Sequence, residues 1–331
     1  MGHILKNFNI VIVGQSGRLQ FEAALFAASF RKSNPDFNST LFVAEPQPNH
    51  KWQSDPRIPA GPARDLLEKL KVTFLPFENQ VFGEYYPNGN KIECLSALPK
   101  GEPFVFFDTD TLITGDITSV PFDFDRPSAS TKVAGTWPEI ELYGPGYTEI
   151  WKSLYDLFDL DFNASLDLSQ PDEFWRRYSY FNAGFFYYKC PHEFGDRYLH
   201  IAKTIRDTPP KAIEVQTLYP WLDQIALPLV LQSFGGGRDA LPHGFLDGSI
   251  STHYRYMSLL YATAPEATID YLTEVTGENR VKKVLKDYDA FKRTIYQNAG
   301  QKARGLFDQN ALPSSERIIR KRLKNHKLWL R

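Results

Sequence analysis

Short apolar runs alternate with amphipathic segments along the first third of the chain. Four of these runs are rich in β-branched and aromatic residues and have the length of buried parallel strands; they span residues 8–13, 40–44, 72–75 and 103–107. The segments between them place apolar residues at helical spacing, over 19–31, 64–71 and 90–98. This order predicts an α/β domain whose mainly parallel sheet is flanked by helices.

The pattern is less regular from residue 132 onward. It predicts strands over 132–136, 178–188 and 249–256, the second of them interrupted at 182–184. A helix is predicted over 221–231, where Pro228 would bend the helix or end its regular part. From about residue 268 the pattern is helical and charged. We find no repeat and no linker, and therefore expect one domain over 1–260 with a helical C-terminal extension over 261–331.

The composition permits a large core and argues against nucleic acid as a partner. The 331 residues are 42% hydrophobic and 15% aromatic, and aromatic rings either fill a core or line a sugar site. The formal net charge of -1 gives no general attraction to nucleic acid, so no such partner is expected. Cys94 and Cys190 imply no disulfide framework. Without a visible secretory signal or membrane span, we expect a cytoplasmic protein.

The last fifteen residues combine basic and apolar positions. They hold seven Lys or Arg residues, no acidic residue, and apolar residues such as Ile319, Leu323 and Trp329. Two interpretations remain open: a segment that lies on an anionic membrane surface, or a soluble helix with a solvated basic face. The first would place the protein at the inner membrane surface by peripheral contact.

Two carboxylates follow the apolar run that ends at Phe107. Asp108 and Asp110 would lie at the carboxyl end of a buried strand, which is where open α/β sheets bind ligands. Because paired carboxylates repel one another, a divalent cation such as Mn²⁺ or Mg²⁺ would stabilise them and would bridge to phosphates. The alternative is a turn in which both side chains cap backbone amides.

Other positions carry candidate chemistry. Asn182 and Gly184 interrupt an aromatic strand, which indicates either close approach of a ligand or of another backbone, or a structural β-bulge. Asp223 opens the helix-like segment that also holds Gln224; it is either a first-turn acid favoured by the helix dipole or a site residue. His253 follows a strand-like run and is either a metal ligand or a packed histidine, and His243 competes for the metal role.

The order of four motifs resembles the GT-A glycosyltransferases, and among them the retaining group that contains glycogenin and bacterial lipopolysaccharide galactosyltransferases. The motifs are Phe-Phe-Asp-Thr-Asp ending at Asp110, Phe-Asn-Ala-Gly ending at Gly184, Leu-Asp-Gln ending at Gln224, and His253-Tyr254. The resemblance covers roughly residues 8 to 256 and implies a nucleotide-sugar-binding catalytic domain over 1–260.

The resemblance implies a role for each motif. Asp108 and Asp110 would bind Mn²⁺ and the diphosphate, and His253 would complete the metal site. Asn182 and Gly184 would line the donor sugar. Asp223 and Gln224 would lie beneath its anomeric carbon. Lys91, at the start of a predicted helix, would contact the phosphates, although a surface lysine is the alternative.

The chain departs from the family pattern at two places. No Lys-Pro-Trp follows His253, which makes the third metal ligand the least secure. Ile225 stands where a second acid often follows the Gln, which argues against a carboxylate nucleophile and favours a front-face reaction, in which the departing phosphate helps to deprotonate the acceptor.

We therefore expect a metal-dependent, retaining transfer of a hexose from a nucleotide diphosphate sugar to a carbohydrate or glycolipid acceptor. The expected donor is a UDP-sugar, and loops within 138–177 are expected to select the acceptor. Three other classes of protein are alternatives to a glycosyltransferase. A haloacid-dehalogenase-like phosphatase would have Thr or Val where Leu112 stands, and a sugar nucleotidyltransferase would have a Pro-Lys pair soon after residues 14–19. A non-catalytic, glycan-binding relative would not need Asp108, Asp110 and Asp223.

Overall fold

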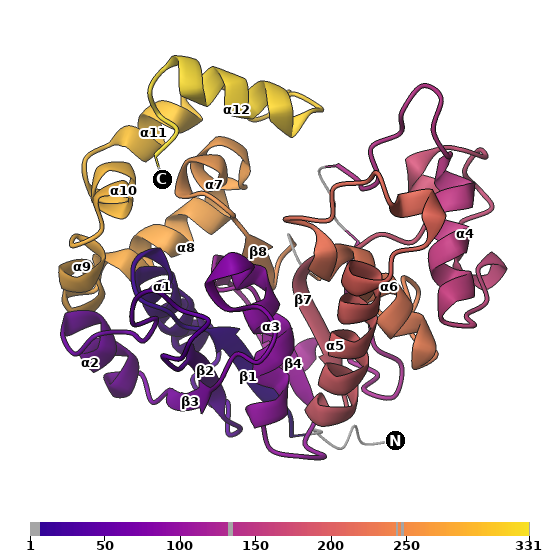
Figure 1. Ribbon diagram of the computed structural model, residues 1–331. Coiled ribbons are helices and arrows are strands. Elements are labelled where there is room, and N and C mark those ends of the chain that lie inside the picture. The colour runs from indigo at the N-terminus through magenta and orange to yellow at the C-terminus, as the bar shows by residue number, and fades with distance from the viewer. Residues whose placement is uncertain (1–6, 132–134, 243, 246–247, 331) are drawn as a thin grey trace, which may run out of the picture.

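A mixed β-sheet forms the centre of the molecule (Figure 1). The computed structural model describes residues 7–131, 135–242, 244–245 and 248–330. Within these residues the sheet has six strands, which lie in the spatial order β3 (Thr73–Phe77), β2 (Leu41–Pro46), β1 (Asn9–Val13), β4 (Phe104–Phe107), β7 (Asn182–Tyr188) and β6 (Ala129–Ser130). The first four are parallel, and β7 and β6 are antiparallel to their neighbours. The expected mixed, mainly parallel sheet is confirmed.

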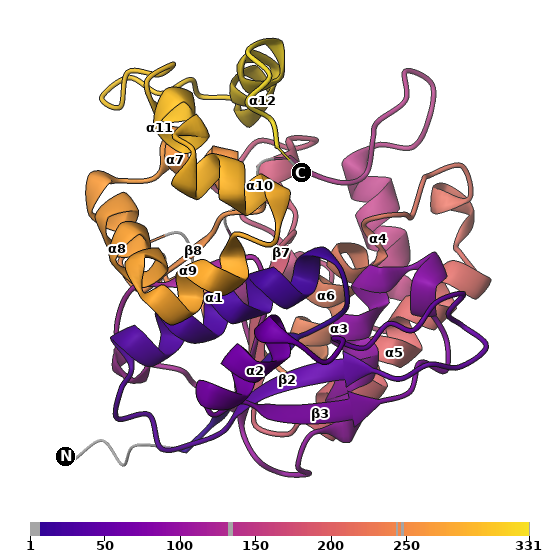
Figure 2. The same ribbon diagram turned by 90° about the vertical axis from the view of Figure 1, so that its left-hand side faces the viewer.

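Helices cover both faces of the sheet. Those of the described residues are α1 (Arg18–Ser33), α2 (Pro62–Lys69), α3 (Asn90–Glu93), α4 (Tyr147–Leu157), α5 (Pro191–Asp207), α6 (Leu222–Ser233), α7 (Met257–Thr263), α8 (Glu266–Gly277), α9 (Asn279–Leu285), α10 (Asp289–Phe291), α11 (Ala299–Arg304) and α12 (Glu316–Asn325). Helices α1, α2, α8 and α9 pack on one face, and α3, α5 and α6 pack on the other (Figures 1 and 2).

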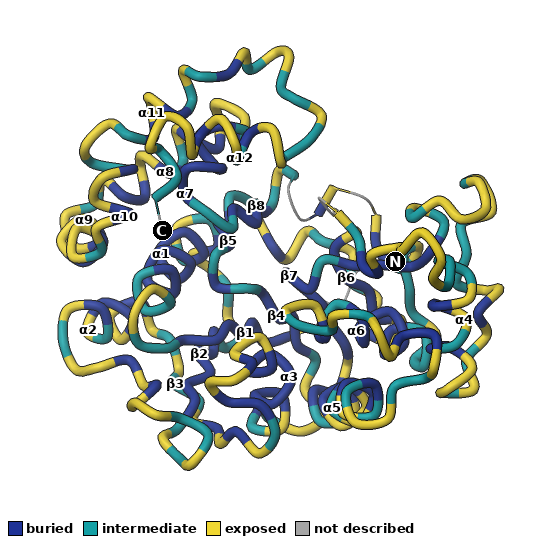
Figure 3. Tube along the Cα trace, turned by 45° about the horizontal axis from the view of Figure 1, so that its top comes forward, coloured by how far each residue is buried: buried dark blue, intermediate teal, exposed yellow. Residues whose placement is uncertain are grey.

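Alternation along the strands explains why both faces are covered. Successive side chains of a strand point to opposite faces, so Ile10 and Ile12 join one hydrophobic core while Val11 and Val13 join the other. All five residues of β1 are buried, which is why the four after Asn9 form a continuous apolar run (Figure 3). The site-bearing strand β4 lies beside it and is equally buried.

Several elements differ from the sequence-based expectations. Helices α4 and α5 were not predicted, nor was the strand β5 (Thr111–Ile113), which pairs with β8 (Ser251–His253) in a separate two-stranded sheet. The strand expected over 178–188 begins only at Asn182. Helix α6 continues past Pro228 to Ser233, because the buried residues around the proline keep it packed in the core. The strand expected over 132–136 falls largely outside the described residues.

The C-terminal extension is helical, as expected, and its last helix has its apolar side inside the protein. Ile319 and Leu323 of α12 are buried against Leu259 of α7 and Phe307, while most of the basic residues of the helix are exposed. The apolar side of α12 is therefore covered by the protein itself. Among the described residues, no helix combines the length and the apolar character that crossing a bilayer requires.

Candidate active site

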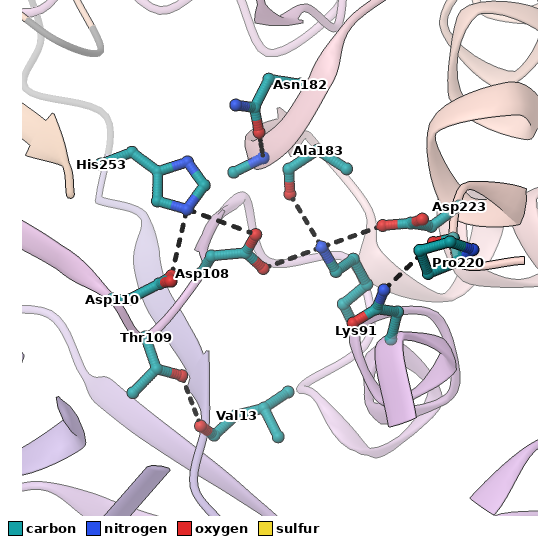
Figure 4. Close-up of polar contacts among 12 residues, drawn as sticks. Val13, Lys91, Asp108, Thr109, Asp110, Asn182, Ala183, Pro220, Asp223 and His253 are labelled. Carbon is teal, nitrogen blue, oxygen red and sulfur yellow. Dashed lines mark hydrogen bonds and ion pairs between the residues drawn. The ribbon is translucent and has the colours of Figure 1, made fainter. Parts of the chain in front are cut away.

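The turn after β4 holds the two central carboxylates. Asp108 follows the last residue of β4, and its backbone N–H donates to the carbonyl of Gly184 on β7 at 2.8 Å. Between the two acids, the Thr109 hydroxyl donates to the carbonyl of Val13 at the end of β1, at 2.6 Å (Figure 4). Thr109 is buried, so this hydrogen bond fixes the turn and leaves Asp108 and Asp110 directed to the other side.

Strand pairing brings His253 to the same place. In the β5–β8 pair His253 lies opposite Thr111, the residue after Asp110. Its Nε2 is 3.1 Å from Asp110 Oδ1 and 3.9 Å from Asp108 Oδ2 (Figure 4). One ligand atom from each of the three residues lies within 4.8 Å of the others. Carboxylates and imidazole are both common ligands of divalent cations, so the donor set fits a divalent cation. The competing His243 lies outside the described residues.

Gly184 makes room for the histidine ring. A Cβ atom at this position would lie 2.5 Å from His253 Nδ1, so no larger residue fits without displacing the ring. The backbone N–H of Gly184 donates to the side chain of Asn182 at 2.9 Å. The close approach expected from this glycine is therefore made by the imidazole, and the Asn182 side chain supports the same bend of the strand.

Lys91 is an interior residue that joins two acids. It is buried, and its Nζ lies 2.8 Å from Asp108 Oδ1 and 3.0 Å from Asp223 Oδ2 (Figure 4). It also donates to the carbonyl of Ala183 at 3.2 Å. The alternative of a surface lysine is therefore wrong, because the short helix α3 faces the sheet rather than solvent.

Asp223 is held by two tyrosines besides Lys91. The Tyr86 hydroxyl donates to Asp223 Oδ1 at 2.7 Å and accepts from its backbone N–H at 2.9 Å. The Tyr198 hydroxyl donates to its carbonyl at 2.7 Å. The side chain of Asp223 is 1% exposed, so it is far more than a solvated first-turn acid. Neither tyrosine carried a signal in the sequence.

Burial and charge together set the pKa values. Burial raises the pKa of Asp108, and Lys91 and His253 oppose that rise without reversing it. Burial would raise the pKa of Asp110 too, but His253 outweighs it and lowers this pKa to about 2. Burial lowers the pKa of His253, yet the carboxylate of Asp110 more than compensates and raises it. Asp110 and His253 thus stabilise each other's charged forms.

These residues line one cavity of about 500 Å³. Besides the three candidate metal ligands, its described lining includes Lys91, Asn182, Asp223 and Gln224, so the predicted site residues other than Gly184 meet in one place. Gln224 accepts a hydrogen bond from the Tyr180 hydroxyl at 3.1 Å. Three arginines also line the cavity: Arg18 at the start of α1, Arg255 just after β8, and Arg320 on α12. Of these, Arg255 and Arg320 were not predicted as site residues.

The glycines near the start of α1 serve the chain turn. A Cβ on Gly14 would meet Val43 Cγ1 at 2.3 Å, and Gly17 has φ of +76°, a conformation that favours glycine. Of the segment 14–18, Arg18 reaches the cavity and pairs with the buried Glu22 at 3.1 Å.

Comparison with known proteins gives a family match over most of the chain. Residues 10–235 match the family described as the Rhodobacterales glycosyltransferase domain. The matched range includes Lys91, Asp108, Asp110, Asn182 and Asp223 and ends before His253. No curated protein matches the chain.

Solved structures of glycosyltransferases show weaker similarity. An active-site mutant of LgtC is 14% identical over 66% of this chain and 69% of its own, with a TM-score of 0.38. The galactosyltransferase LgtC in complex with donor and acceptor sugar analogs gives the same identity and coverage, with a TM-score of 0.37. GlyE of Streptococcus pneumoniae TIGR4 is 8% identical over 97% of this chain and 65% of its own, with a TM-score of 0.37.

Proposed function

Because the chain belongs to the Rhodobacterales glycosyltransferase domain family, we propose that it transfers a hexose from a nucleoside diphosphate donor, a UDP-sugar, to a carbohydrate or glycolipid acceptor. Family membership makes the protein a glycosyltransferase and sets aside the phosphatase, nucleotidyltransferase and non-catalytic alternatives. The proposal adds the donor class, the acceptor class, the dependence on a metal and the stereochemistry.

The observation that carries the proposal is the grouping of Asp108, Asp110 and His253 at one end of the cavity. Three carboxylates lie in the cavity wall, and Lys91 is the basic residue paired directly with two of them. Around Lys91, three carboxylates face one ammonium group, and this local negative charge suits a divalent cation. Mn²⁺ or Mg²⁺ held there would neutralise the diphosphate as the glycosidic bond breaks.

Each carboxylate of the cavity already has a partner or a candidate metal to bind, and this supports retention by a front-face route. Among the described lining residues the acids are Asp108, Asp110 and Asp223. The first two belong to the candidate metal site, and both oxygens of Asp223 are engaged, by Tyr86 and by Lys91. None is left as a nucleophile or as a general base, so the departing phosphate itself would take the acceptor proton.

The remaining predicted residues line the space between the metal site and α6. Asp223 would place negative charge where positive charge develops at the anomeric carbon, and Gln224 lines the cavity next to it. Asn182 and Ala183 line the same wall, with Gly184 behind them, so we assign this wall to the donor sugar. Lys91, between Asp108 and Asp223, would lie beside the diphosphate end of that sugar.

A second cavity, of about 730 Å³, is a candidate site for the acceptor. It shares Tyr180 with the first cavity and is lined by Trp175 and Tyr178, with Arg176 and Asp167 among the polar groups. Aromatic rings with polar neighbours suit pyranose rings, whose faces are apolar and whose edges carry hydroxyls. These residues come largely from the segment 138–177 in which acceptor recognition was expected.

The test is donor turnover in the presence and absence of metal. Release of nucleoside diphosphate is measured from a panel of sugar nucleotides with Mn²⁺, with Mg²⁺ and with EDTA, for the wild type, Asp110→Asn and Asp65→Asn. Asp65 is exposed on α2 and does not line the cavity, so it is the matched control. We expect metal-dependent release from one donor, lost only in Asp110→Asn. Absence of release and of nucleotide binding with every donor would refute the proposal.

A further inference from the structure

The basic residues that line the cavity at the candidate metal site differ in how many acids they contact. Lys91 lies between two carboxylates, and Arg18 has Glu22 as its partner. Arg255 and Arg320, in contrast, share one carboxylate, that of Glu316. The two guanidinium groups therefore leave one positive charge without a directly paired acid at the rim of the cavity. An anionic ligand group fits such a place.

Glu316 fixes both arginines from a different part of the chain. Its Oε2 lies 2.5 Å from Arg255 Nη2, and its Oε1 accepts from Arg320 Nε at 2.6 Å. Glu316 opens α12, and Arg320 lies one turn further along the same helix. The Arg320 guanidinium also lies 5.4 Å from the centre of the Trp329 ring, which packs against Tyr256 at 4.4 Å. The C-terminal segment is thus attached beside the metal site.

The backbone at Arg255 is held in an unusual conformation. Arg255 has φ of +55°, in the left-handed region that non-glycine residues rarely adopt. It comes two residues after His253, and such conformations cluster at functional sites. Among the described residues its Nε is buried without a hydrogen-bond partner, while about 30% of its side chain remains exposed. The chain therefore holds a guanidinium against the cavity at a conformational cost.

We propose that Arg255 and Arg320, positioned by Glu316, bind the diphosphate of the donor, so that helix α12 completes the nucleotide site. This inference rests on the proposed function and extends it to the C-terminal extension. A nucleoside diphosphate carries more negative charge than one divalent cation neutralises, and the other basic residues are already paired. The two arginines supply the missing positive charge from the side of the cavity formed by β8 and α12.

The test compares diphosphate with monophosphate binding. The wild type is titrated with UDP, GDP and ADP in Mn²⁺ by calorimetry, and the diphosphate bound most tightly is compared with its monophosphate in each variant. Arg320→Ala should weaken diphosphate binding roughly tenfold and monophosphate binding far less, because a charge-assisted contact to the second phosphate is lost. Arg320→Lys should recover part of the difference, and Lys321→Ala, an exposed neighbour on the same helix, should change neither.

The outcomes separate the inference from the proposed function. If Arg320→Ala leaves diphosphate binding unchanged, or weakens the binding of diphosphate and monophosphate equally, the phosphate-binding role of Arg320 is overturned. Diphosphate binding by the wild type would still support the proposed donor class. If the wild type binds none of the three diphosphates, both proposals fall. Should Arg320→Ala lower the thermal midpoint, Arg320→Gln replaces it, since glutamine can still donate to Glu316 but carries no charge.

Discussion

Lys91 Nζ lies 2.8 Å from Asp108 Oδ1, so the two oxygens of that carboxylate have different partners. Oδ1 faces the lysine, while Oδ2 faces His253 and the candidate metal site (Figure 4). The same ammonium reaches Asp223 on the far side. One buried cation therefore holds together helix α3, the turn after β4 and the start of α6. It links the candidate metal site to Asp223 on the opposite side of the cavity.

Replacement of Lys91 by Met should destabilise the protein by roughly 3–5 kcal/mol, because two buried carboxylates would lose their shared partner. Urea unfolding followed by circular dichroism measures the change. The matched control is Lys189→Met, which removes an exposed pair with Asp125 and should leave the unfolding midpoint nearly unchanged. A Lys91→Met protein as stable as the control would show that the two acids do not depend on the lysine.

Replacement of Gly184 by Ala should weaken metal binding while the fold persists. The new methyl group would overlap the His253 ring, whose Nδ1 lies 2.5 Å from the ideal Cβ position, and would push the ring away from Asp110. Titration with Mn²⁺, followed by electron paramagnetic resonance, reports the affinity, which should fall at least about tenfold. Gly277→Ala is the control, since nothing lies within 4 Å of a Cβ there. Wild-type affinity in Gly184→Ala would exclude His253 as a ligand.

The parts of the site that the sequence predicted are those that local patterns specify. A buried apolar run followed by Asp108 and Asp110 locates a strand and its carboxyl end, because burial leaves a continuous apolar pattern. The interruption at Gly184 signalled a close approach but not its partner, since the partner, His253, comes from a distant strand.

The parts that the sequence did not predict depend on long-range pairing. The three-residue strand β5 is too short for a periodic signal, and its pairing with β8 is what places His253. A surface position was the alternative for Lys91 because lysines are usually exposed, and its burial follows from the packing of α3 in the interior. Arg255 and Arg320 are brought together by the packing of α12 on α7, which no local pattern of charges encodes.

Replacement of Trp175 by Ala should impair acceptor use and spare donor chemistry. Trp175 lines the second cavity and is absent from the described lining of the first, so the change removes an aromatic face offered to an acceptor sugar. We expect KM for the acceptor to rise about tenfold, in line with about 0.5–1.5 kcal/mol for a ring contact plus lost burial. Metal-dependent hydrolysis of the donor in water should be unchanged. Phe174→Ala, at an exposed neighbour outside that lining, is the control, and an equal effect of both would contradict the assignment.

Asp223 should act as a fixed charge and not as a nucleophile. Its two oxygens are engaged by the Tyr86 hydroxyl at 2.7 Å and by Lys91 at 3.0 Å, so neither is free to form a bond to the anomeric carbon. Asp223→Ala should therefore lower turnover by about 10²–10³-fold through lost electrostatic stabilisation, and added azide should not restore it. A carboxylate nucleophile would behave differently, because azide could occupy its place and give a glycosyl azide of inverted configuration. Proton NMR of the products distinguishes the two cases: retention in the wild type without azide rescue supports the front-face route, and an inverted azide adduct would establish covalent catalysis by Asp223.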